Sequence, residues 1–383
     1  MPSQPAVRVA IGPEGGGEVG RVTLQTVADA VGVSRMTVSN AFSRPDQLSP
    51  AMRERILATA DELGYSGPDP AARALARGRA GAVGVVMTES LGDAFLDPVT
   101  AAFFGAVAHE LAPTGLALSL IPADTIGERS AARDLAIDAA LIYACAGDVE
   151  AVRSLQRRNL PIVSVDREPE STGTSIRLDE RLGGRLAAQH LIDLGHTDIA
   201  VFTMQPSLPG PAWADDPRGR LGDHVADERL RGVLEATDAA GLTLRVFHVK
   251  DNNDRYIVPG AAALVADRDR PDAVVCFSDA MAAALSAAAQ SAGVRVPEDM
   301  SIVGYDDSRL ASAVSPPLTT VRQDFVAKGQ AAARALVGAI EAMRAGAQLP
   351  LPAEDVILPV DLVVRGSTGA PRSGRRESVG GPT

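Results

Sequence analysis

The chain has 383 residues, 46% of them hydrophobic, and a formal net charge of -11. A chain of this length exceeds what one hydrophobic core usually organises, so we expect a globular protein with at least two domains. The acidic balance excludes a protein that binds nucleic acid over its whole surface, although one basic domain remains compatible with it.

Targeting signals and cysteine usage point to a cytoplasmic protein. Residues 1–20 contain Gly and Pro but no basic segment followed by an apolar one, and no later stretch approaches eighteen uninterrupted apolar residues. We interpret this leader as disordered and expect no membrane insertion. Cys145 and Cys276 lie in apolar runs typical of buried strands, which predicts core residues in a reducing compartment, neither a disulfide nor a metal site.

Residues 21–66 carry the pattern of three short helices over one small core. The apolar spacing of the first two helices breaks at Gly32, and Ser34 is a natural N-cap for the second helix. A third helix begins where Ser49 can act as the N-cap and Pro50 can occupy the first helical position. This pattern predicts a compact helical head.

The first two helices match a helix-turn-helix. That motif needs a small residue where the helices cross, a glycine in the left-handed turn and an apolar residue that returns to the core. Ala28, Gly32 and Val38 fill these positions, and an ordinary helical hairpin is the alternative. Residues 21–79 hold eight Arg and six acids, a balance of +2 that leaves -13 elsewhere, so the prediction depends on pattern and not on charge.

The second helix presents side chains suited to a DNA major groove. Arg pairs with guanine, Asn pairs with adenine and Met can touch a thymine methyl group, so Arg35, Met36 and Asn40 are candidate base-reading residues. Hydroxyl groups can bind phosphate oxygens without specifying sequence, although at Ser34 and Ser49 a helix cap is an equally good interpretation. The candidate phosphate contacts are Thr23, Ser34, Thr37, Ser39 and Ser49.

Residues 67–80 form a candidate hinge or linker. Asp69 can cap, and Pro70 can begin, a helix of barely two turns that ends by Gly78. A helix this short is not stable alone in water, so we expect it to form only when something packs against it.

Between residues 81 and 366, short β-rich apolar runs alternate with helical segments. Buried parallel strands have this pattern, and the alternation implies right-handed βαβ units. Four runs precede the Asp166–Asp179 region and four follow it, which predicts two similar doubly wound α/β lobes with a cleft between them. We expect residues 205–227 to form an exposed loop and residues 367–383 a disordered tail.

Polar residues that end the apolar runs are candidates for ligand contact, because two-lobed α/β domains bind ligands at the carboxyl ends of their strands. Asp166, Asp279, Asp306 and Asp307 occupy such positions. An acid there is about as often a helix N-cap as a ligand contact, and Asp279 would cap the helix that follows it.

These segments together resemble the LacI/GalR family of bacterial repressors. VTLQTVADAVGVSRMTVSNAF, LSPAMRERILATADELGY and DPAARALAR resemble that family's head and hinge, while VDRE, LIDLGHTDIAV, ERLRG, SDAMA, SIVGYDD and PPLTTVRQD resemble its core. The resemblance runs from about Val22 to Arg365. It implies a homodimeric or tetrameric repressor that binds double-stranded operator DNA and has a core similar to periplasmic sugar-binding proteins.

The resemblance also implies roles for single residues of the head and hinge. Arg35, Met36 and Asn40 fall on base-reading positions. Leu75 falls on a hinge-helix leucine that enters the minor groove, where an apolar wedge kinks DNA, and Ala72 is assigned to the same DNA contact. A plain linker is the alternative for this segment.

For the core, the resemblance implies a small-molecule effector bound between the lobes. Arg229 and Asp279 have counterparts that clamp ligand hydroxyls, and Ser278 replaces the family's usual Asn before that acid. An Arg–Asp pair with an aromatic wall suits a neutral polyol or sugar. The predicted effector contacts are Phe95, Asp97, Asp166, Arg229, Asp279, Gln323 and Phe325.

The expected function is a transcription regulator, without cofactor or metal, whose operator affinity a ligand changes by about 5–150-fold. The alternative is an α/β enzyme or a sugar-binding protein with an incidental helical head. Against an enzyme, the five histidines show no metal spacing or paired nucleophile, and the sequence contains neither a G-x-S-x-G elbow nor a phosphate loop. Against an exported binding protein, residues 1–20 lack a signal peptide.

Overall fold

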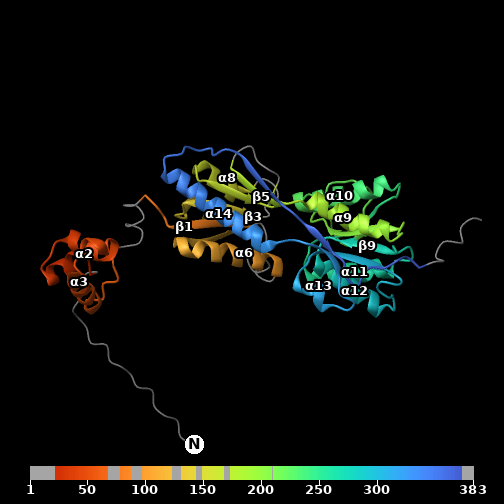
Figure 1. The fold of residues 1–383 in the computed structure, drawn as a ribbon, viewed down its shortest axis with the longest axis horizontal. Coiled ribbons are helices and arrows are strands. Elements are labelled where there is room, and N and C mark those ends of the chain that lie inside the picture. The colour runs from red at the N-terminus through yellow and green to blue at the C-terminus, as the bar shows by residue number, and fades with distance from the viewer. Residues whose placement is uncertain are drawn as a thin grey trace, which may run out of the picture. The chain divides into compact units, whose positions relative to one another are not determined.

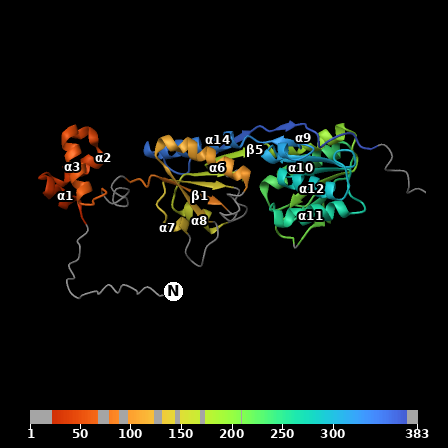
Figure 2. The same cartoon turned by 90° about the horizontal axis from the view of Figure 1, so that it is seen from below.

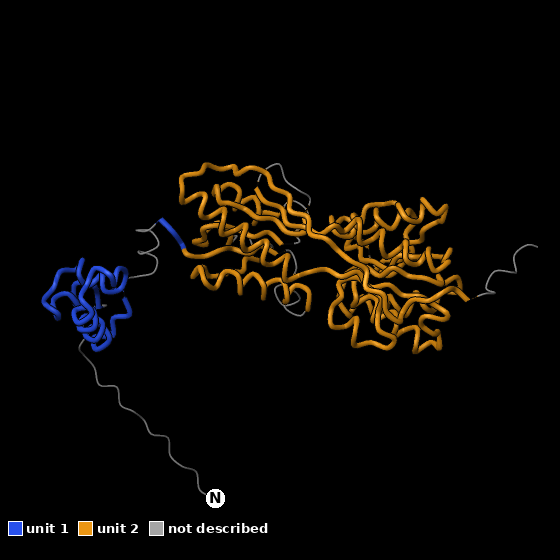
Figure 3. The backbone as a smooth tube through the Cα atoms, in the orientation of Figure 1, with its two compact units in different colours: residues 1–80 blue, residues 81–383 orange. Residues whose placement is uncertain are grey.

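The structure is a computed structural model that describes residues 22–67, 78–87, 97–122, 131–143, 149–167, 173–208 and 210–372. The chain forms two compact units that divide between Ala80 and Gly81 (Figure 3). Ala72, Leu75 and Phe95, three predicted contact residues, lie outside the described residues. Within the described ranges, every helix is too short or too polar to cross a bilayer.

The head consists of the three predicted helices and a short turn. These elements are α1 (Leu24–Val31), α2 (Arg35–Ser43), the 3-10 turn η1 (Pro45–Gln47) and α3 (Pro50–Glu62). Gly32 ends α1 with φ of 74°, the left-handed turn that a side chain would strain. Seven buried residues make the core of the head: Val27, Ala28, Val31, Val38, Ala41, Ile56 and Ala60.

The first lobe of the core is a six-stranded parallel sheet in the order β12-β5-β4-β3-β1-β2. Its elements are β1 (Ala82–Met87), α6 (Pro98–Leu111), η2 (Ala112–Thr114), β2 (Ala117–Pro122), α7 (Ala131–Asp134), β3 (Ala139–Tyr143), α8 (Glu150–Arg157), β4 (Ile162–Val165), β5 (Thr174–Leu178), α14 (Phe325–Arg344) and β12 (Glu354–Leu358).

The second lobe is a seven-stranded sheet in the order β13-β11-β10-β9-β6-β8-β7, parallel except for its two edge strands β7 and β13. Its elements are α9 (Glu180–Asp193), β6 (Ile199–Met204), β7 (Ala212–Trp213), α10 (His224–Ala239), β8 (Arg245–Val249), α11 (Asp254–Ala266), β9 (Ala273–Cys276), α12 (Asp279–Ser291), β10 (Ser301–Asp306), α13 (Arg309–Ala313), β11 (Thr319–Arg322) and β13 (Asp361–Val363). The predicted architecture, a helical head followed by two doubly wound lobes, is confirmed.

Three crossovers connect the two lobes. They join β5 to α9, β11 to α14, and β12 to β13. Helix α14 follows a second-lobe strand but packs beside α6 of the first lobe, as Figures 1 and 2 show. Leu336 of α14 joins Phe103 and Val107 of α6 in the first-lobe core. Each lobe is therefore built from separate parts of the sequence.

Two predicted irregular segments are partly ordered. Residues 205–227 contain β7 and the start of α10. Leu221 and Asp227 are buried, and the Asp227 carboxylate accepts the Leu221 backbone N–H at 2.6 Å. The predicted tail begins too early at residue 367. Ser367 is fully buried, and its hydroxyl donates to the Ile302 carbonyl at 2.6 Å.

Candidate nucleic-acid interface and ligand cleft

The predicted base-reading residues lie on α2. Arg35 and Met36 are exposed, with Met36 69% exposed, and Asn40 is half-buried near the end of the helix. An exposed methionine on a helix whose Val38 is fully buried marks the face turned away from the head's core. This face carries the groups that the sequence assigns to a major groove.

Three of the predicted phosphate contacts act as helix N-caps. The hydroxyls of Thr23, Ser34 and Ser49 accept backbone N–H groups at the starts of α1, α2 and α3. The Ser34 hydroxyl also lies 2.8 Å from that of Thr37, and Ser39 is half-buried on α2. The cap interpretation of Ser34 and Ser49 is therefore correct, while a phosphate contact by the same hydroxyls stays a prediction.

Gln47 is a residue that sequence reasoning missed. It ends the turn η1, is exposed, and its Oε1 accepts the Asn40 side-chain N–H at 3.1 Å. The second N–H and the oxygen of the Asn40 side-chain amide remain available, and these are the two groups that adenine requires. The Asn40–Gln47 contact fixes the orientation of the candidate reading group.

In the core, the first lobe contributes a buried ion pair at the carboxyl end of β4. Asp166 follows β4 with φ of 55°, and Lys328 Nζ from α14 lies 2.6 Å from Asp166 Oδ2. Asp166 Oδ1 is buried and has no hydrogen-bond partner among the described residues. Because buried polar atoms are normally paired, this unused acceptor is the property expected of a ligand contact.

The second lobe contributes a buried arginine. Arg229 of α10 donates from Nε to Glu180 Oε2 at 2.7 Å and from Nη1 to the Phe277 carbonyl at 2.5 Å, and its guanidinium lies 3.6 Å from the centroid of the Tyr305 ring. Burial raises the pKa of the Glu180 carboxyl, but the charge and hydrogen bond of Arg229 outweigh it, so that the pKa is lowered. Arg229 is thus held in one orientation by an ion pair and a ring face.

Asp306 and Gln323 meet where β10 and β11 end. Gln323 Nε2 donates to Asp306 Oδ1 at 2.7 Å, and both side chains are buried. Burial and the nearby Asp279 carboxylate raise the pKa of Asp306 well above its usual range. Gln323 was predicted from the sequence, whereas Asp306 was noted as a strand-ending acid but not selected.

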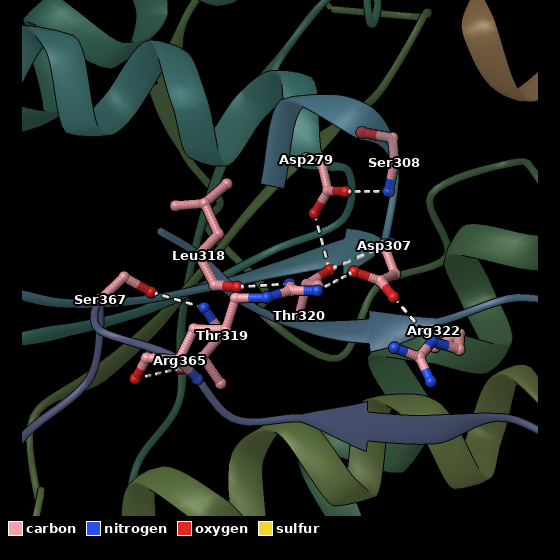
Figure 4. Close-up of polar contacts among 9 residues, drawn as sticks. All are labelled: Asp279, Asp307, Ser308, Leu318, Thr319, Thr320, Arg322, Arg365 and Ser367. Atoms are coloured by element: carbon pink, nitrogen blue, oxygen red, sulfur yellow. Dashed lines mark hydrogen bonds and ion pairs between the residues drawn. The ribbon is translucent and has the colours of Figure 1, made fainter. Parts of the chain in front are cut away.

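Asp279 is buried and joins the start of α12 to β11 and to the segment after β10. Its carboxylate accepts the Ser308 backbone N–H at 2.7 Å and the Thr320 hydroxyl at 2.6 Å (Figure 4). The prediction that Asp279 caps α12 is wrong, because Ser278 is the N-cap and its hydroxyl accepts the Met281 N–H at 3.1 Å. Both Asp279 oxygens already bind protein donors, so its ligand contact stays a prediction with less support than one by Asp306.

The pKa of Asp279 gives a testable pH dependence. Burial raises that pKa to about 6, so between about pH 4 and pH 6 the folded core retains a proton that the unfolded chain has released. The free energy of unfolding should therefore fall as the pH rises through this window, by roughly 2–3 kcal/mol for this group. Asp279→Asn should make the slope less steep, and the part due to the raised pKa of Asp306 should remain; urea unfolding with fluorescence of Trp213, the chain's single tryptophan, measures it.

The matched control for this measurement is Asp254→Asn. Asp254 is exposed at the start of α11, so its replacement should leave the slope unchanged. A slope that is equally steep in Asp279→Asn would assign the pH dependence to another group.

The remaining predicted cleft residues have structural partners. Asp97 is the N-cap of α6 and accepts the backbone N–H groups of Val99 and Thr100. Burial and the Asp279 charge raise the pKa of Asp306 most, Arg229 lowers it, and the charge of Asp97 raises it further by a smaller amount. Phe325 begins α14 and is half-buried, and the centroid of its ring lies 5.8 Å from Lys328 Nζ.

A cavity of about 270 Å³ lies beside the first crossover. Of the predicted effector contacts, Asp166 lines it, and Glu180 joins it there from the second lobe. Its lining comes from both lobes and is mostly polar: Asp166, Arg177, Leu178, Asp179, Glu180, Arg181, His224, Val225 and Glu228. Among the described residues, no group of His, Cys, Asp and Glu side chains is arranged to hold a metal ion.

Glu180 and Lys328 are cleft residues that sequence reasoning missed. Lys328 had a detectable signal, because it occupies the apolar face of α14 four residues before Ala332 and eight before Leu336. A charged residue on such a face is buried only with a partner. Glu180 had no comparable signal, since an acid in the first turn of a helix is common.

Two family models match this chain. The model described as bacterial regulatory proteins of the lacI family matches residues 23–67, and the model described as a periplasmic binding protein-like domain matches residues 188–368. These ranges cover the helix-turn-helix head and most of the second lobe.

Named relatives align with most of the chain. It is 37% identical to an HTH-type transcriptional regulator of Mycolicibacterium smegmatis, over 82% of this chain and 90% of that protein. It is 35% identical to the HTH-type transcriptional regulator IpsA of Corynebacterium glutamicum, with 83% and 91% covered. It is 32% identical to the HTH-type transcriptional repressor PurR of Photobacterium profundum, with 79% and 86% covered.

Two solved structures of transcription regulators resemble this chain over most of its length. The complex of the transcriptional regulator CelR with cellobiose is 29% identical and has a TM-score of 0.63, over 91% of this chain and 100% of that one. The lac repressor dimer bound to operator and the anti-inducer ONPF is 24% identical with a TM-score of 0.73, over 91% and 99%, and supports the fold. The named relatives are transcriptional regulators and a repressor, which decides against the enzyme alternative, and this chain is a member of the LacI family of DNA-binding transcriptional regulators.

Proposed function

We propose that the chain is a repressor that binds a near-palindromic operator as a homodimer, and that a neutral sugar or polyol bound between the lobes controls operator affinity. For DNA binding, the supporting observation is the exposed face of α2 with Arg35, Met36 and Asn40. A lac repressor dimer, a structural neighbour, was solved on its operator. Leu75, outside the described residues, is the proposed minor-groove wedge of the hinge.

The observation that carries the effector proposal is the set of buried polar groups at the strand ends of both lobes. Asp166 Oδ1 offers an unused acceptor from the first lobe, and Asp306 and Gln323 offer an acid and an amide from the second. Arg229 and Lys328 are each neutralised by a carboxylate, which favours a neutral ligand with many hydroxyls over an anion. CelR, a relative of this chain, was solved with cellobiose.

The decisive experiment joins DNA binding to effector binding. Gel shifts on the protein's own promoter region should be specific and should weaken steeply with salt. A thermal-shift panel of sugars that includes cellobiose and ribose should identify the effector, since a ligand at 100 times its dissociation constant adds about 2.7 kcal/mol of stability. That sugar should then change operator affinity, whereas turnover of a sugar by the protein would revive the enzyme alternative.

Gln47→Leu should broaden the base preference at one position of each operator half-site. Without the hydrogen bond from Asn40, the Asn40 amide loses its fixed orientation, and discrimination at that base should fall about fivefold or more. Selection from a random duplex library measures this, and Asn40→Ala should lose the same preference.

Gln25→Leu is the matched control for this selection. Gln25 makes a comparable side-chain hydrogen bond to Asp29, but on α1, so its loss should not alter base preference. If Gln47→Leu selects the wild-type sequence with the wild-type preference, Gln47 does not orient Asn40.

A further inference from the structure

Two consecutive aspartates at the end of β10 have backbone conformations that L-amino acids rarely adopt. Asp306 has φ of 117° and Asp307 has φ of 52°. Such conformations persist in folded proteins only where the surrounding contacts enforce them. Those contacts therefore decide where the Asp306 carboxylate points.

Two arginines from different parts of the chain hold the Asp307 carboxylate (Figure 4). Arg322, the last residue of β11, places Nε 2.6 Å from Asp307 Oδ2, and Arg365, two residues beyond β13, places Nη2 2.5 Å from Oδ1. Partial burial raises the pKa of Asp307, but the hydrogen bonds from Arg365 and Arg322 outweigh it and lower the pKa. The side chains of Asp307 and Arg365 are 11% and 21% exposed, so their ion pair is better shielded than an ordinary surface pair, whereas the Arg322 side chain is 53% exposed.

Arg365 is itself fixed to the sheet of the second lobe. Its Nη1 donates to the Leu318 carbonyl at 2.9 Å, and its backbone N–H donates to the Thr319 hydroxyl at 2.9 Å. Two residues later, the fully buried Ser367 accepts the Thr319 backbone N–H at 2.8 Å. The guanidinium therefore has one well-defined position relative to β10 and β11.

The neighbouring Asp306 is buried and has a different partner. Its carboxylate accepts Gln323 Nε2 at 2.7 Å, and Gln323 is the first residue of the crossover from β11 to α14. Because Asp306 and Asp307 are adjacent, anchoring the Asp307 side chain restricts the peptide that carries Asp306. The third crossover, from β12 to β13, leads into Arg365.

We propose that Arg365, together with Arg322, is a positioning residue for the cleft acid Asp306. By holding Asp307, Arg365 maintains the reversed backbone and keeps Asp306 against Gln323. The role rests on the proposed effector function, because Asp306 and Gln323 belong to the proposed effector cleft. The two arginines lie beside two of the three crossovers, Arg322 just before the one from β11 to α14 and Arg365 just after β13, where the one from β12 ends.

Hydrogen–deuterium exchange of the full chain without any sugar tests the proposal. In Arg365→Met, amides of residues 305–308 and 322–324 should exchange about tenfold faster or more, since a charge-assisted contact that enforces them is lost. Arg372→Met is the matched control from the same segment, because the Arg372 guanidinium pairs with Asp299 at 2.7 Å on the surface. It should leave both segments unchanged.

The opposing outcome is equally specific. If Arg365→Met accelerates exchange only at residues 318–320 and 363–369, Arg365 merely anchors the chain segment that contains it, and the proposal is overturned. Arg365→Lys keeps a charge near Asp307 but loses the planar fork, so it should restore part of the protection at 305–308.

Trp213 fluorescence would reveal whether Arg365→Met folds. If it does not fold, a second variant tests the same proposal. Asp307→Asn instead removes the negative charge and one of the two acceptor oxygens, and should loosen residues 305–308 and 322–324 in the same way; unchanged exchange there would overturn the proposal. No sugar enters these measurements. A sugar panel without any response would count against the proposed function alone, while unchanged exchange would count against the positioning role alone.

Discussion

Arg229→Met is expected to lower the free energy of unfolding of the core by roughly 3–5 kcal/mol, because it leaves the buried Glu180 carboxylate without its counterion. The arginine also gives up its hydrogen bond to Phe277 and its contact with the Tyr305 ring. Urea unfolding followed by the fluorescence of Trp213 measures the change in the lobe that contains Arg229.

Arg231→Met is the matched control for this variant. Arg231 lies two residues along the same helix and pairs with Glu228, but its side chain is 51% exposed, so its loss should change stability by less than about 1 kcal/mol. A double variant, Arg229→Met with Glu180→Met, should recover most of the loss because no uncompensated charge remains. Equal losses of unfolding free energy in Arg229→Met and Arg231→Met would show that burial of the Arg229–Glu180 pair does not determine the loss.

Ile56→Ala is expected to reduce operator affinity by one to three orders of magnitude, although Ile56 lies on α3 and not on the helix that carries the candidate reading residues. Truncating a fully buried isoleucine costs roughly 2–5 kcal/mol, and a head of this size rarely holds more than about 3–5 kcal/mol of stability. Where the cost exceeds the stability, by up to about 2 kcal/mol for each head, most heads would be unfolded, and binding of the two heads of the proposed dimer must then supply the folding free energy.

The core supplies an internal reference for this experiment. Because the head and the core are separate compact units, the Trp213 unfolding curve should be unchanged in Ile56→Ala. Leu63→Ala, at a position that is 36% exposed, should leave operator affinity within about twofold. Retained operator binding by Ile56→Ala would mean that the head is far more stable than its small core implies.

The local pattern was sufficient for the head and for the eight strands predicted from apolar runs, because both depend on residues near each other in the sequence. It failed for β5, β7, β11, β12 and β13. β12 shows why: the segment Glu354–Leu358 is short and begins with two acids, and it is a strand because it pairs with β5, far earlier in the chain. Nothing local distinguishes such a strand from a loop.

The cleft was predicted less completely than the fold, for a related reason. Asp279 and Asp306 each lie at the end of an apolar run. The Asp279 carboxylate accepts the Thr320 hydroxyl and the Ser308 backbone N–H, whereas the Asp306 carboxylate accepts the Gln323 amide. Which carboxylate already accepts hydrogen bonds from protein donors depends on residues that the sheet brings together. The pairing of Lys328 with Asp166 likewise joins residues that lie far apart in the sequence.

The threefold passage of the chain between the lobes also sets an order of events during synthesis. The head is complete once residue 67 has emerged, but the first lobe lacks α14 and β12 until Leu358 has been made. At about 5–20 residues per second, that interval lasts roughly 15–60 s. During it, Phe103 and Val107 lack the helix that covers them, so the nascent core depends on protection from aggregation long after the head can fold.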